Sequence, residues 1–343
     1  MSTVEPLQFS RLIQALLDES KPFHPRYLHR LSDLDPSDTA LLADTWPKIS
    51  LHRRESLLED LEELHVADDL VCFEEVGRLA LKDHAPTVRS RAIRILTEYE
   101  LVDLLPAFVE LSEYDPDLEV RSRATSALGA YIFMGEVEDI SQAKLKRVEE
   151  CLLRLVSESQ PALVRRKALE ALGYSSHEEV IDLIEKAYNS GDTDWLAAAL
   201  FAMGRSANSR WKPQVLKMLD HQHPAVRAEA ASAAGELEIK AARLKLLELL
   251  DDSDLDVRMA AIWALSQLGG AGVRQALEKL LEMTDIDEET NQIDNALENL
   301  DFTEEMNELS LFEIPEDGNE IGESSEDDVD DNYDDLISEE NEV

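Results

Sequence analysis

The residues Val226-Arg227-Ala228-Glu229-Ala230 are one copy of a phrase that this chain repeats, and the repetition decides the fold. The phrase is an apolar residue, usually Val, then Arg, two variable residues and an Ala. Its copies begin at Val88, Val120, Val164, Trp195, Val226 and Val257. Successive copies lie 31 or 32 residues apart, except for one longer step between Arg121 and Arg165. A fixed period of this length is typical of stacked helix pairs, not of a closed globular domain.

Each repeat is predicted to contain two helices, from about Glu75 to Leu281. The phrase opens one helix, and the following segment carries apolar residues at helical spacing, as in Val180, Ile184 and Ala187. A Gly follows four of the phrase helices, and we expect it to adopt the left-handed conformation that ends a helix. These glycines are Gly129, Gly173, Gly204 and Gly235.

Three segments are predicted along the chain. Residues 1–50 are expected to form short capping helices interrupted by prolines, with Asp35-Pro36-Ser37 as a helix start. Residues 51–302 form the solenoid, including a degenerate first repeat from His52 to Leu64 and an insertion of about a dozen residues near Tyr131–Glu136. We expect the insertion to be a loop packed on the solenoid. Residues 303–343 are expected to be an acidic, disordered tail.

Charge and cysteine content limit the classes of function. The chain has a net charge of −41, and the part after Lys279 has no Lys or Arg but 26 Asp and Glu residues. This charge disfavours nucleic acid as a partner. No segment is apolar enough to span a membrane or to act as a secretion signal, so no membrane partner is expected. Cys72 and Cys151 are isolated thiols, which favours a cytoplasmic location.

The repeats resemble the HEAT repeat family, and in particular its short form of the phycobilisome-lyase type. In that pattern an Asp lies six residues before the phrase Arg, whereas Ser159, Ser190 and His221 take its place in three repeats and Leu196 replaces one Arg. The resemblance implies an all-α, right-handed α-solenoid in which Asp and Arg side chains form a ladder between repeats. The predicted ladder residues are Asp83, Arg89, Asp115, Arg121, Arg165, Arg227, Asp252 and Arg258.

Candidate binding residues lie two and five positions after the phrase Arg. The resemblance implies that these positions line the concave side of the solenoid. They are basic in the first repeats and apolar in the later ones, although a solvated charged face and a pair of core aromatics would give the same pattern. The predicted partner-binding residues at these positions are Arg91, Arg94, Arg123, Lys167, Phe201 and Trp263, and Arg166 is added because it lies beside Lys167.

The sequence offers little for catalysis. His221 and His223 form a close pair without a third ligand, and His177-Glu178 stands alone where di-iron hydroxylases of this fold need several such pairs. Gly269-Gly270-Ala271-Gly272 lacks the Lys-Ser/Thr of a phosphate-binding loop. We therefore expect no catalytic residue, metal or cofactor.

Three functions remain open. The leading hypothesis is a non-enzymatic, monomeric scaffold whose concave face binds an acidic protein segment with apolar anchors, the chain's own tail being one candidate. The second is a lyase-like or chaperone-like handler of a prosthetic group, suggested by the family alone. The third is nucleic-acid binding through the basic half of the groove, regulated by the tail.

Overall fold

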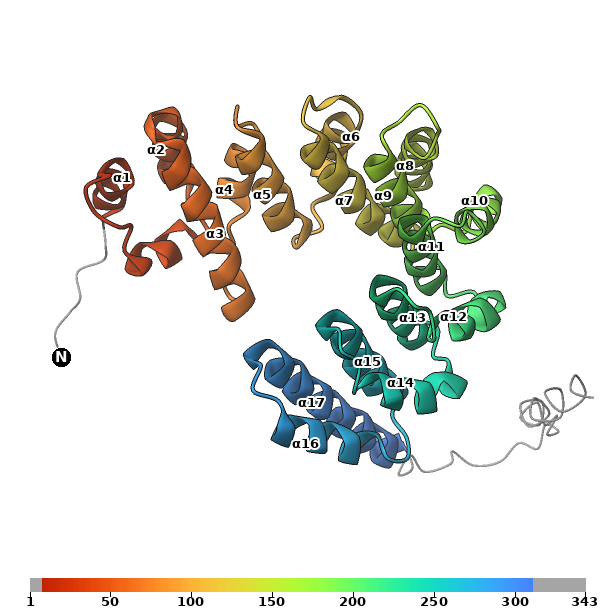
Figure 1. Ribbon diagram of the computed structural model, residues 1–343. Coiled ribbons are helices and arrows are strands. Elements are labelled where there is room, and N and C mark those ends of the chain that lie inside the picture. Colours follow the sequence, from red (N-terminus) through yellow and green to blue (C-terminus); the bar gives the residue numbers. More distant parts are fainter. Residues whose placement is uncertain (1–7, 311–343) are drawn as a thin grey trace, which may run out of the picture. The chain divides into compact units, whose positions relative to one another are not determined.

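The computed structural model describes residues 8–310, and the side chains of residues 8–303. Every regular element in this range is a helix, and successive helix pairs lie side by side in a curved row (Figure 1). The predicted α-solenoid is confirmed. In the described part of the chain, no helix is both long and apolar enough to cross a membrane.

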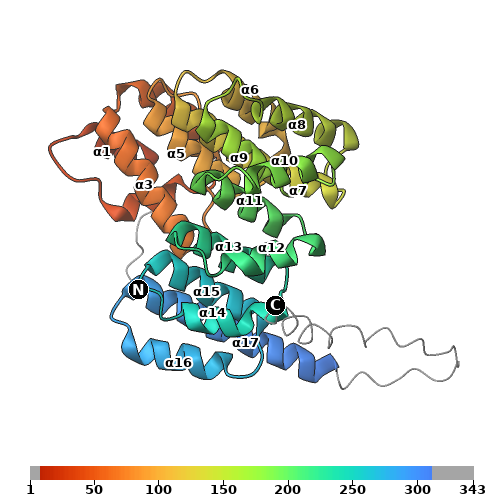
Figure 2. The same cartoon turned by 45° about the vertical axis from the view of Figure 1, so that its right-hand side comes forward.

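Each phrase lies on a helix that packs against the phrase helices before and after it. These phrase helices lie on the inner side of the curved row, and Figure 2 shows the later ones following one another in order. They are α5 (Pro86–Thr97), α7 (Leu118–Glu136), α9 (Ala162–Leu172), α11 (Thr193–Arg205), α13 (Pro224–Glu236) and α15 (Leu255–Leu268).

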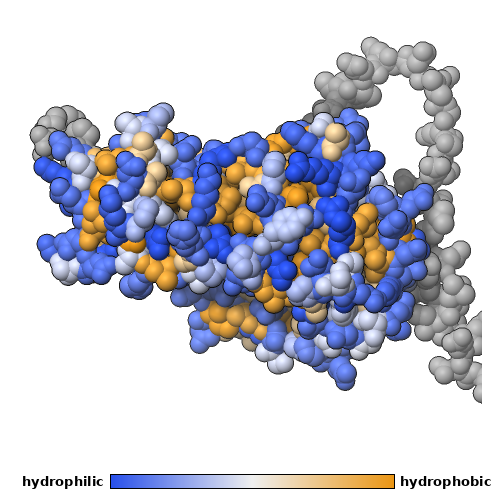
Figure 3. All heavy atoms as spheres, turned by 90° about the horizontal axis from the view of Figure 1, so that it is seen from above, coloured by the Kyte–Doolittle hydropathy of each residue, from blue (hydrophilic) through white to orange (hydrophobic). Residues whose placement is uncertain are grey.

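A second set of helices covers the outer side of the row, each packed on the phrase helix of its repeat. Seen from above the row, apolar side chains show as stripes between hydrophilic ones (Figure 3). The outer helices are α4 (Glu74–Ala80), α6 (Leu105–Tyr114), α8 (Gln142–Leu155), α10 (Glu178–Tyr188), α12 (Lys212–Met218) and α14 (Arg243–Leu249). Short 3-10 turns lead into three of them: η3 (Val102–Leu104), η4 (Ser209–Trp211) and η5 (Lys240–Ala242).

The phrase specifies the core because its apolar positions share one helix face. In α9, Val164, Ala168 and Leu172 follow each other at four-residue intervals, and none of the three is exposed to solvent. The same holds for Val88, Ala92 and Leu96 in α5, to within 1%. One apolar interior therefore continues from repeat to repeat, as a solenoid requires.

The N-terminal helices are joined to the first repeat by specific bonds. They are α1 (Phe9–Leu17), η1 (Pro25–Leu31), α2 (Pro36–Thr45), η2 (Trp46–Lys48) and α3 (Leu51–Ala67). The helix start predicted at Asp35 is confirmed, since its carboxylate accepts hydrogen bonds from the backbone N–H groups of Ser37 and Asp38. The Trp46 indole N–H donates to Asp83, across 2.7 Å. These bonds are consistent with a segment that covers the end of the core.

The insertion differs from the sequence prediction, whereas the predicted tail boundary lies close to the division of the chain into two compact units, Met1–Leu300 and Asp301–Val343. The extra residues after Arg121 lengthen α7 to 19 residues and α8 to 14, so Tyr131 to Glu136 are helical instead of forming a loop. Apolar residues such as Ile132 are buried there, which makes continuation of the helix favourable. After α16 (Val273–Met283), α17 runs from Asp287 to Ser310, so the predicted boundary at residue 302 falls inside a helix. The disorder predicted for the rest of the tail lies outside the described residues.

The repeated glycines do not act as left-handed caps, which corrects the sequence prediction. None of Gly129, Gly173, Gly204 and Gly235 has a positive φ angle. Each instead meets an Ala of the next phrase helix, and a Cβ on Gly173 would lie 2.8 Å from the Cα of Ala202. The glycines are needed because two helix backbones approach each other closely at these points.

We predict that Gly173→Ala destabilises the protein by about 1–3 kcal/mol, because the added methyl group meets backbone atoms that cannot yield cheaply. Gly129→Ala is the matched control. Its Cβ would lie 3.3 Å from the Cα of Ala171, and the gain in helix propensity offsets the tighter contact. Urea denaturation of both variants tests this, and equal costs would contradict it.

Candidate functional site

Two adjoining hollows lie on the inner side of the repeats from α7 to α15. Their volumes are about 700 and 380 Å³, and both are lined by Phe201, Gly204, Arg205 and Glu236. The larger hollow reaches back to α7, and the smaller one reaches forward to Trp263 on α15. We call the two together the inner hollow.

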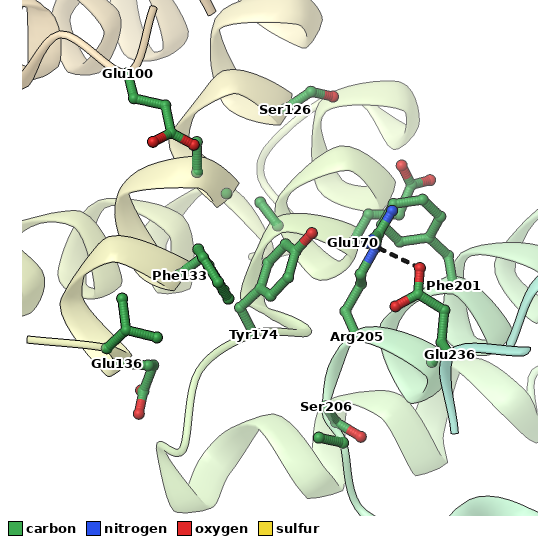
Figure 4. A pocket seen from close by; sticks show the side chains of 16 residues that line it. Glu100, Ser126, Phe133, Glu136, Glu170, Tyr174, Phe201, Arg205, Ser206 and Glu236 are labelled. Atoms are coloured by element: carbon green, nitrogen blue, oxygen red, sulfur yellow. Dashed lines mark ion pairs between the residues drawn. The ribbon is translucent and has the colours of Figure 1, made fainter. Parts of the chain in front are cut away.

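Aromatic side chains and one guanidinium group form the centre of the inner hollow. The Arg205 guanidinium stacks on Tyr174 at 5.4 Å and on Phe201 at 5.2 Å, measured to the ring centroids. It also forms an ion pair of 2.8 Å with Glu236 (Figure 4). Phe133 meets the Tyr174 ring edge-on, with the centroids 5.6 Å apart. Such stacked groups are rigid and present an apolar surface beside a fixed charge.

Carboxylates surround this centre. Burial raises the pKa of Glu170, although Lys167 bonds to its carboxylate at 2.6 Å. Burial, together with the negative charge of Glu170, raises the pKa of Glu229 to about 7. Glu229 is therefore partly protonated at neutral pH, and its charge responds to any cation that enters the hollow.

The residues that sequence analysis missed lie one helical turn beyond those it selected. Tyr174, Arg205 and Glu236 occur nine positions after the phrase residue of three successive repeats, directly after the repeated Gly. Positions two, five and nine share one helix face. Extending the pattern by one turn would have found all three, whereas Phe133 lies in the lengthened part of α7 and outside the repeat pattern.

The predicted basic residues are already paired within the chain. Arg91 lies 3.2 Å from Glu59, and Arg94 lies 3.4 Å from Glu62. The remaining pairs are Arg91 with Glu62, Arg123 with Glu119, Arg166 with Asp194 and Lys167 with Glu170. None of the five lines the inner hollow as described. The partners come from neighbouring turns of the same helix, from α3 and, for Arg166, from α11, which the spacing of the repeat did not reveal.

The two predicted apolar residues do line the inner hollow. Phe201 and Trp263 are partly exposed and so are not core residues. Trp263 also packs against Gly235, where an added Cβ would lie 2.7 Å from the indole ring. The alternative that both aromatics are buried does not hold.

The ladder has two complete rungs with the same geometry. Arg89 donates from Nε and Nη2 to the two carboxylate oxygens of Asp115, at 2.8 and 2.7 Å. Arg227 does the same to Asp252, at 2.8 Å for both bonds. Each Asp also accepts a hydrogen bond from the backbone N–H two residues later, Asp252 from Asp254 for example. The acid thus orders the turn before its own phrase helix and binds the Arg of the preceding repeat.

The first and last rungs use residues outside the repeat pattern. Asp83 pairs with Arg54 on α3, at 2.6 Å, so the degenerate first repeat does contribute an Arg. Arg258 pairs with Glu289, at 2.6 Å, instead of a residue six positions before the next phrase. Thr284 orders the turn there in place of an acid, since its hydroxyl accepts a hydrogen bond from the Ile286 N–H. Arg54 lies 35 residues before Arg89, outside the 31- or 32-residue period, so the spacing of the phrase does not reveal it.

The ladder is interrupted in the middle of the solenoid. Arg121 and Arg165 make no ion pair with any described residue, and Ser159 and Ser190 stand where the acids of their rungs would be. The Nε of Arg121 is buried without a partner in the described structure. At the next rung both members are replaced, by Leu196 and His221.

The histidines have structural positions. His177 accepts a hydrogen bond from the Glu179 N–H at the start of α10, and His221 accepts one from the His223 N–H. In the described part of the chain, no three His, Cys, Asp or Glu residues are grouped as metal ligands would be.

The stacked helix pairs and the Arg–Asp rungs define an α-solenoid protein. Residues 212–298 match a family model described as HEAT repeats, and residues 164–190 match the PBS lyase HEAT-like repeat. The chain therefore contains HEAT repeats in these two segments. No curated protein matches its sequence.

Several solved structures are similar to this chain at low sequence identity. The complex of CpcE and CpcF of phycocyanin lyase from Nostoc is 20% identical, covers 66% of this chain and 94% of its own, and has a TM-score of 0.44. YibA of Escherichia coli is 17% identical, covers 83% and 98%, and has a TM-score of 0.40. Human deoxyhypusine hydroxylase in complex with glycerol is 21% identical, covers 76% and 95%, and has a TM-score of 0.34.

We predict that Arg227→Ala lowers the free energy of unfolding by about 2–3 kcal/mol, because it leaves the half-buried Asp252 carboxylate without its partner. Arg165→Ala is the matched control and should cost less, since no carboxylate is orphaned. A double-mutant cycle between Arg227 and Asp252 isolates the rung from the turn that Asp252 orders. A coupling near zero would contradict the prediction.

We predict a pH-dependent effect of Glu229→Gln on the melting temperature. The folded pKa of about 7 exceeds the unfolded value of 4.5, so the folded state holds the extra proton between these pH values. The stability contribution of Glu229 therefore falls as the pH rises from 4.5 to about 7. Glutamine, which stays neutral, should raise the melting temperature by a few degrees at pH 8 and change it little at pH 4.5. An identical difference at both pH values would count against this.

Proposed function

We propose that this protein is a non-enzymatic scaffold that binds a segment of another protein in the inner hollow. The observation that carries the proposal is the stack of Tyr174, Arg205 and Phe201, which is partly exposed on a rigid row of helices. A monomeric solenoid has no structural need to expose such a stack in a concave surface. Aromatic and Arg side chains of this kind commonly dominate the energy of protein interfaces.

The lining of the inner hollow supports binding more than catalysis. The described residues that line it include no His and no Cys, and a hydroxyl group among them is bonded to the backbone. Ser206, for example, donates to the backbone carbonyl of Met203. Arg205 is held by Glu236 and by two rings, which fixes its position but limits its use in a reaction.

The charge of the lining favours a partner segment that carries Lys or Arg beside aromatic or aliphatic residues. Arg205 is the one basic residue in the described lining, whereas five carboxylates line it: Glu100, Glu136, Glu170, Glu229 and Glu236. This proposal departs from the acidic partner expected from sequence, because Arg91, Arg123 and Lys167 are each neutralised by a carboxylate of the chain itself. A cation that displaces the proton of Glu229 would gain a full ion pair.

We predict that the full-length protein, used to select peptides from a random displayed library, enriches sequences in which Lys or Arg adjoins an aromatic or aliphatic residue. Phe201→Ser should abolish this enrichment, because it removes the ring on which Arg205 stacks. Leu244→Ser, on the outer helix α14 and 76% exposed in the wild type, is the matched control and should leave it unchanged.

Selection of the same peptides by Phe201→Ser and by the wild type would refute the inner hollow as the binding site. Enrichment of acidic peptides that depends on Phe201 would instead support the acidic partner.

A further inference from the structure

A second, separate hollow lies where the ladder is interrupted. Its volume is about 250 Å³, and it shares no lining residue with the inner hollow. Its walls are mainly apolar and come from α9, α10, α11 and the turn before α9. Those that matter for the argument are Val156, Leu169, Leu183, Ala187 and Trp195, with Arg165 among them. We call it the ladder hollow.

The guanidinium group of Arg165 is held in place but has no carboxylate. Its Nε donates to the backbone carbonyl of Val156 at 3.3 Å, and its Cζ atom lies over the Trp195 ring, 4.9 Å from the ring centroid. No ion pair joins it to a described residue. Arg227, in the equivalent position of another repeat, uses Nε and Nη2 for the carboxylate of Asp252. The two terminal nitrogens of Arg165 are therefore left for an outside acceptor.

The cause of the missing rung is the residue at position 190. Ser190 performs half of the task of the ladder acid, because its hydroxyl accepts a hydrogen bond from the Asp192 N–H at 3.2 Å. Asp252 makes the same turn bond and also reaches back to Arg227. Ser190 is too short and uncharged, so it orders the turn without binding Arg165. The space that a carboxylate would fill remains open as part of the ladder hollow.

We propose that the ladder hollow binds a carboxylate side chain from an acidic segment of a partner protein, with a neighbouring apolar side chain on Leu169, Leu183 and Trp195. The partner's Asp or Glu completes the interrupted rung from outside. A guanidinium fork matches a carboxylate with two parallel hydrogen bonds, and its stacking on Trp195 pre-orders it for that contact.

The charged and apolar residues that line the ladder hollow determine which class of ligand it can bind. Lys186 also lines the ladder hollow, but it is paired with Glu158 at 3.2 Å, so Arg165 supplies the net positive charge. The apolar walls favour an amino-acid segment over a free inorganic anion, which would gain nothing from them.

Ser190→Asp offers a direct test, because it supplies the missing acid from within the chain. The variant should melt at a higher temperature than the wild type, through a new rung with Arg165, and should lose the outside ligand. The probe is a fluorescein-labelled synthetic peptide whose sequence is not taken from this chain, with one Glu between a Leu and a Trp and otherwise only Gly and Ser, so that it offers one carboxylate beside apolar side chains. Its binding to the full-length protein is followed by fluorescence anisotropy.

We expect Ser190→Asp and Arg165→Gln each to weaken binding of this peptide by about tenfold or more, the effect of losing one charge-assisted pair. His221→Asp is the matched control. It introduces the same acid at the equivalent position, but the preceding repeat has Leu196 there, so binding should not change. Phe201→Ser should also leave it unchanged, which separates this site from the inner hollow.

Two outcomes would overturn the proposal. One is binding that is equally strong in the wild type, Ser190→Asp and Arg165→Gln. The other uses a full-length variant in which the Asp and Glu residues of 326–342 are replaced by Asn and Gln. If the peptide binds this variant through Arg165 but does not bind the wild type, the chain's own tail is the occupant and a separate partner is not.

Discussion

Close contact between successive phrase helices is the constraint on which the rest of this protein depends. Neither helix of a repeat can bury its apolar face alone, so the interior exists only while neighbouring backbones stay in register. The Gly–Ala contacts show how tight that register is, since an added methyl group at Gly173 would lie 2.8 Å from a backbone carbon of the next helix. Both candidate sites are surfaces of this stack, so their shape follows from the same contact.

The Arg–Asp ladder contributes less to the stability of the stack than the buried apolar surface does. Its main effect is to fix the turns and the register between repeats. Each complete rung binds the Arg of one repeat to the turn that begins the next phrase helix, as Arg227 does with Asp252. Such pairs are half-buried, and their net contribution is small against the buried apolar surface. Their value lies in fixing the turn and in excluding a shifted register. Where Ser190 replaces the acid, its hydroxyl still orders the turn. The positive charge of Arg165 is then left without an acid of the rung.

The two hollows have opposite chemistry for a common reason. On a phrase helix, the residues two, five and nine positions after the phrase Arg lie on the inner side of the row. In the described lining of the inner hollow, carboxylates surround the guanidinium group of Arg205. The ladder hollow instead exposes a phrase Arg, Arg165, whose positive charge is not paired with an acid of its rung. A strongly acidic chain can therefore offer one site for a cationic segment and one for an acidic segment. The two sites can coexist because screening by salt confines the electric field of each site to its own surface.

The sequence by itself determined the helix pairs, their period and the core, because the phrase places Val, Ala and Leu on one face by simple helical geometry. The resemblance to HEAT repeats also implied that Phe201 and Trp263 face the concave side. The tertiary structure decided the rest. Whether a basic side chain stays unpaired depended on carboxylates from other turns and helices, such as Glu59 beside Arg91. The role of the glycines depended on how closely two helices approach, and no local pattern encodes that distance. Local spacing sets which residues share a face, whereas packing sets what each face meets.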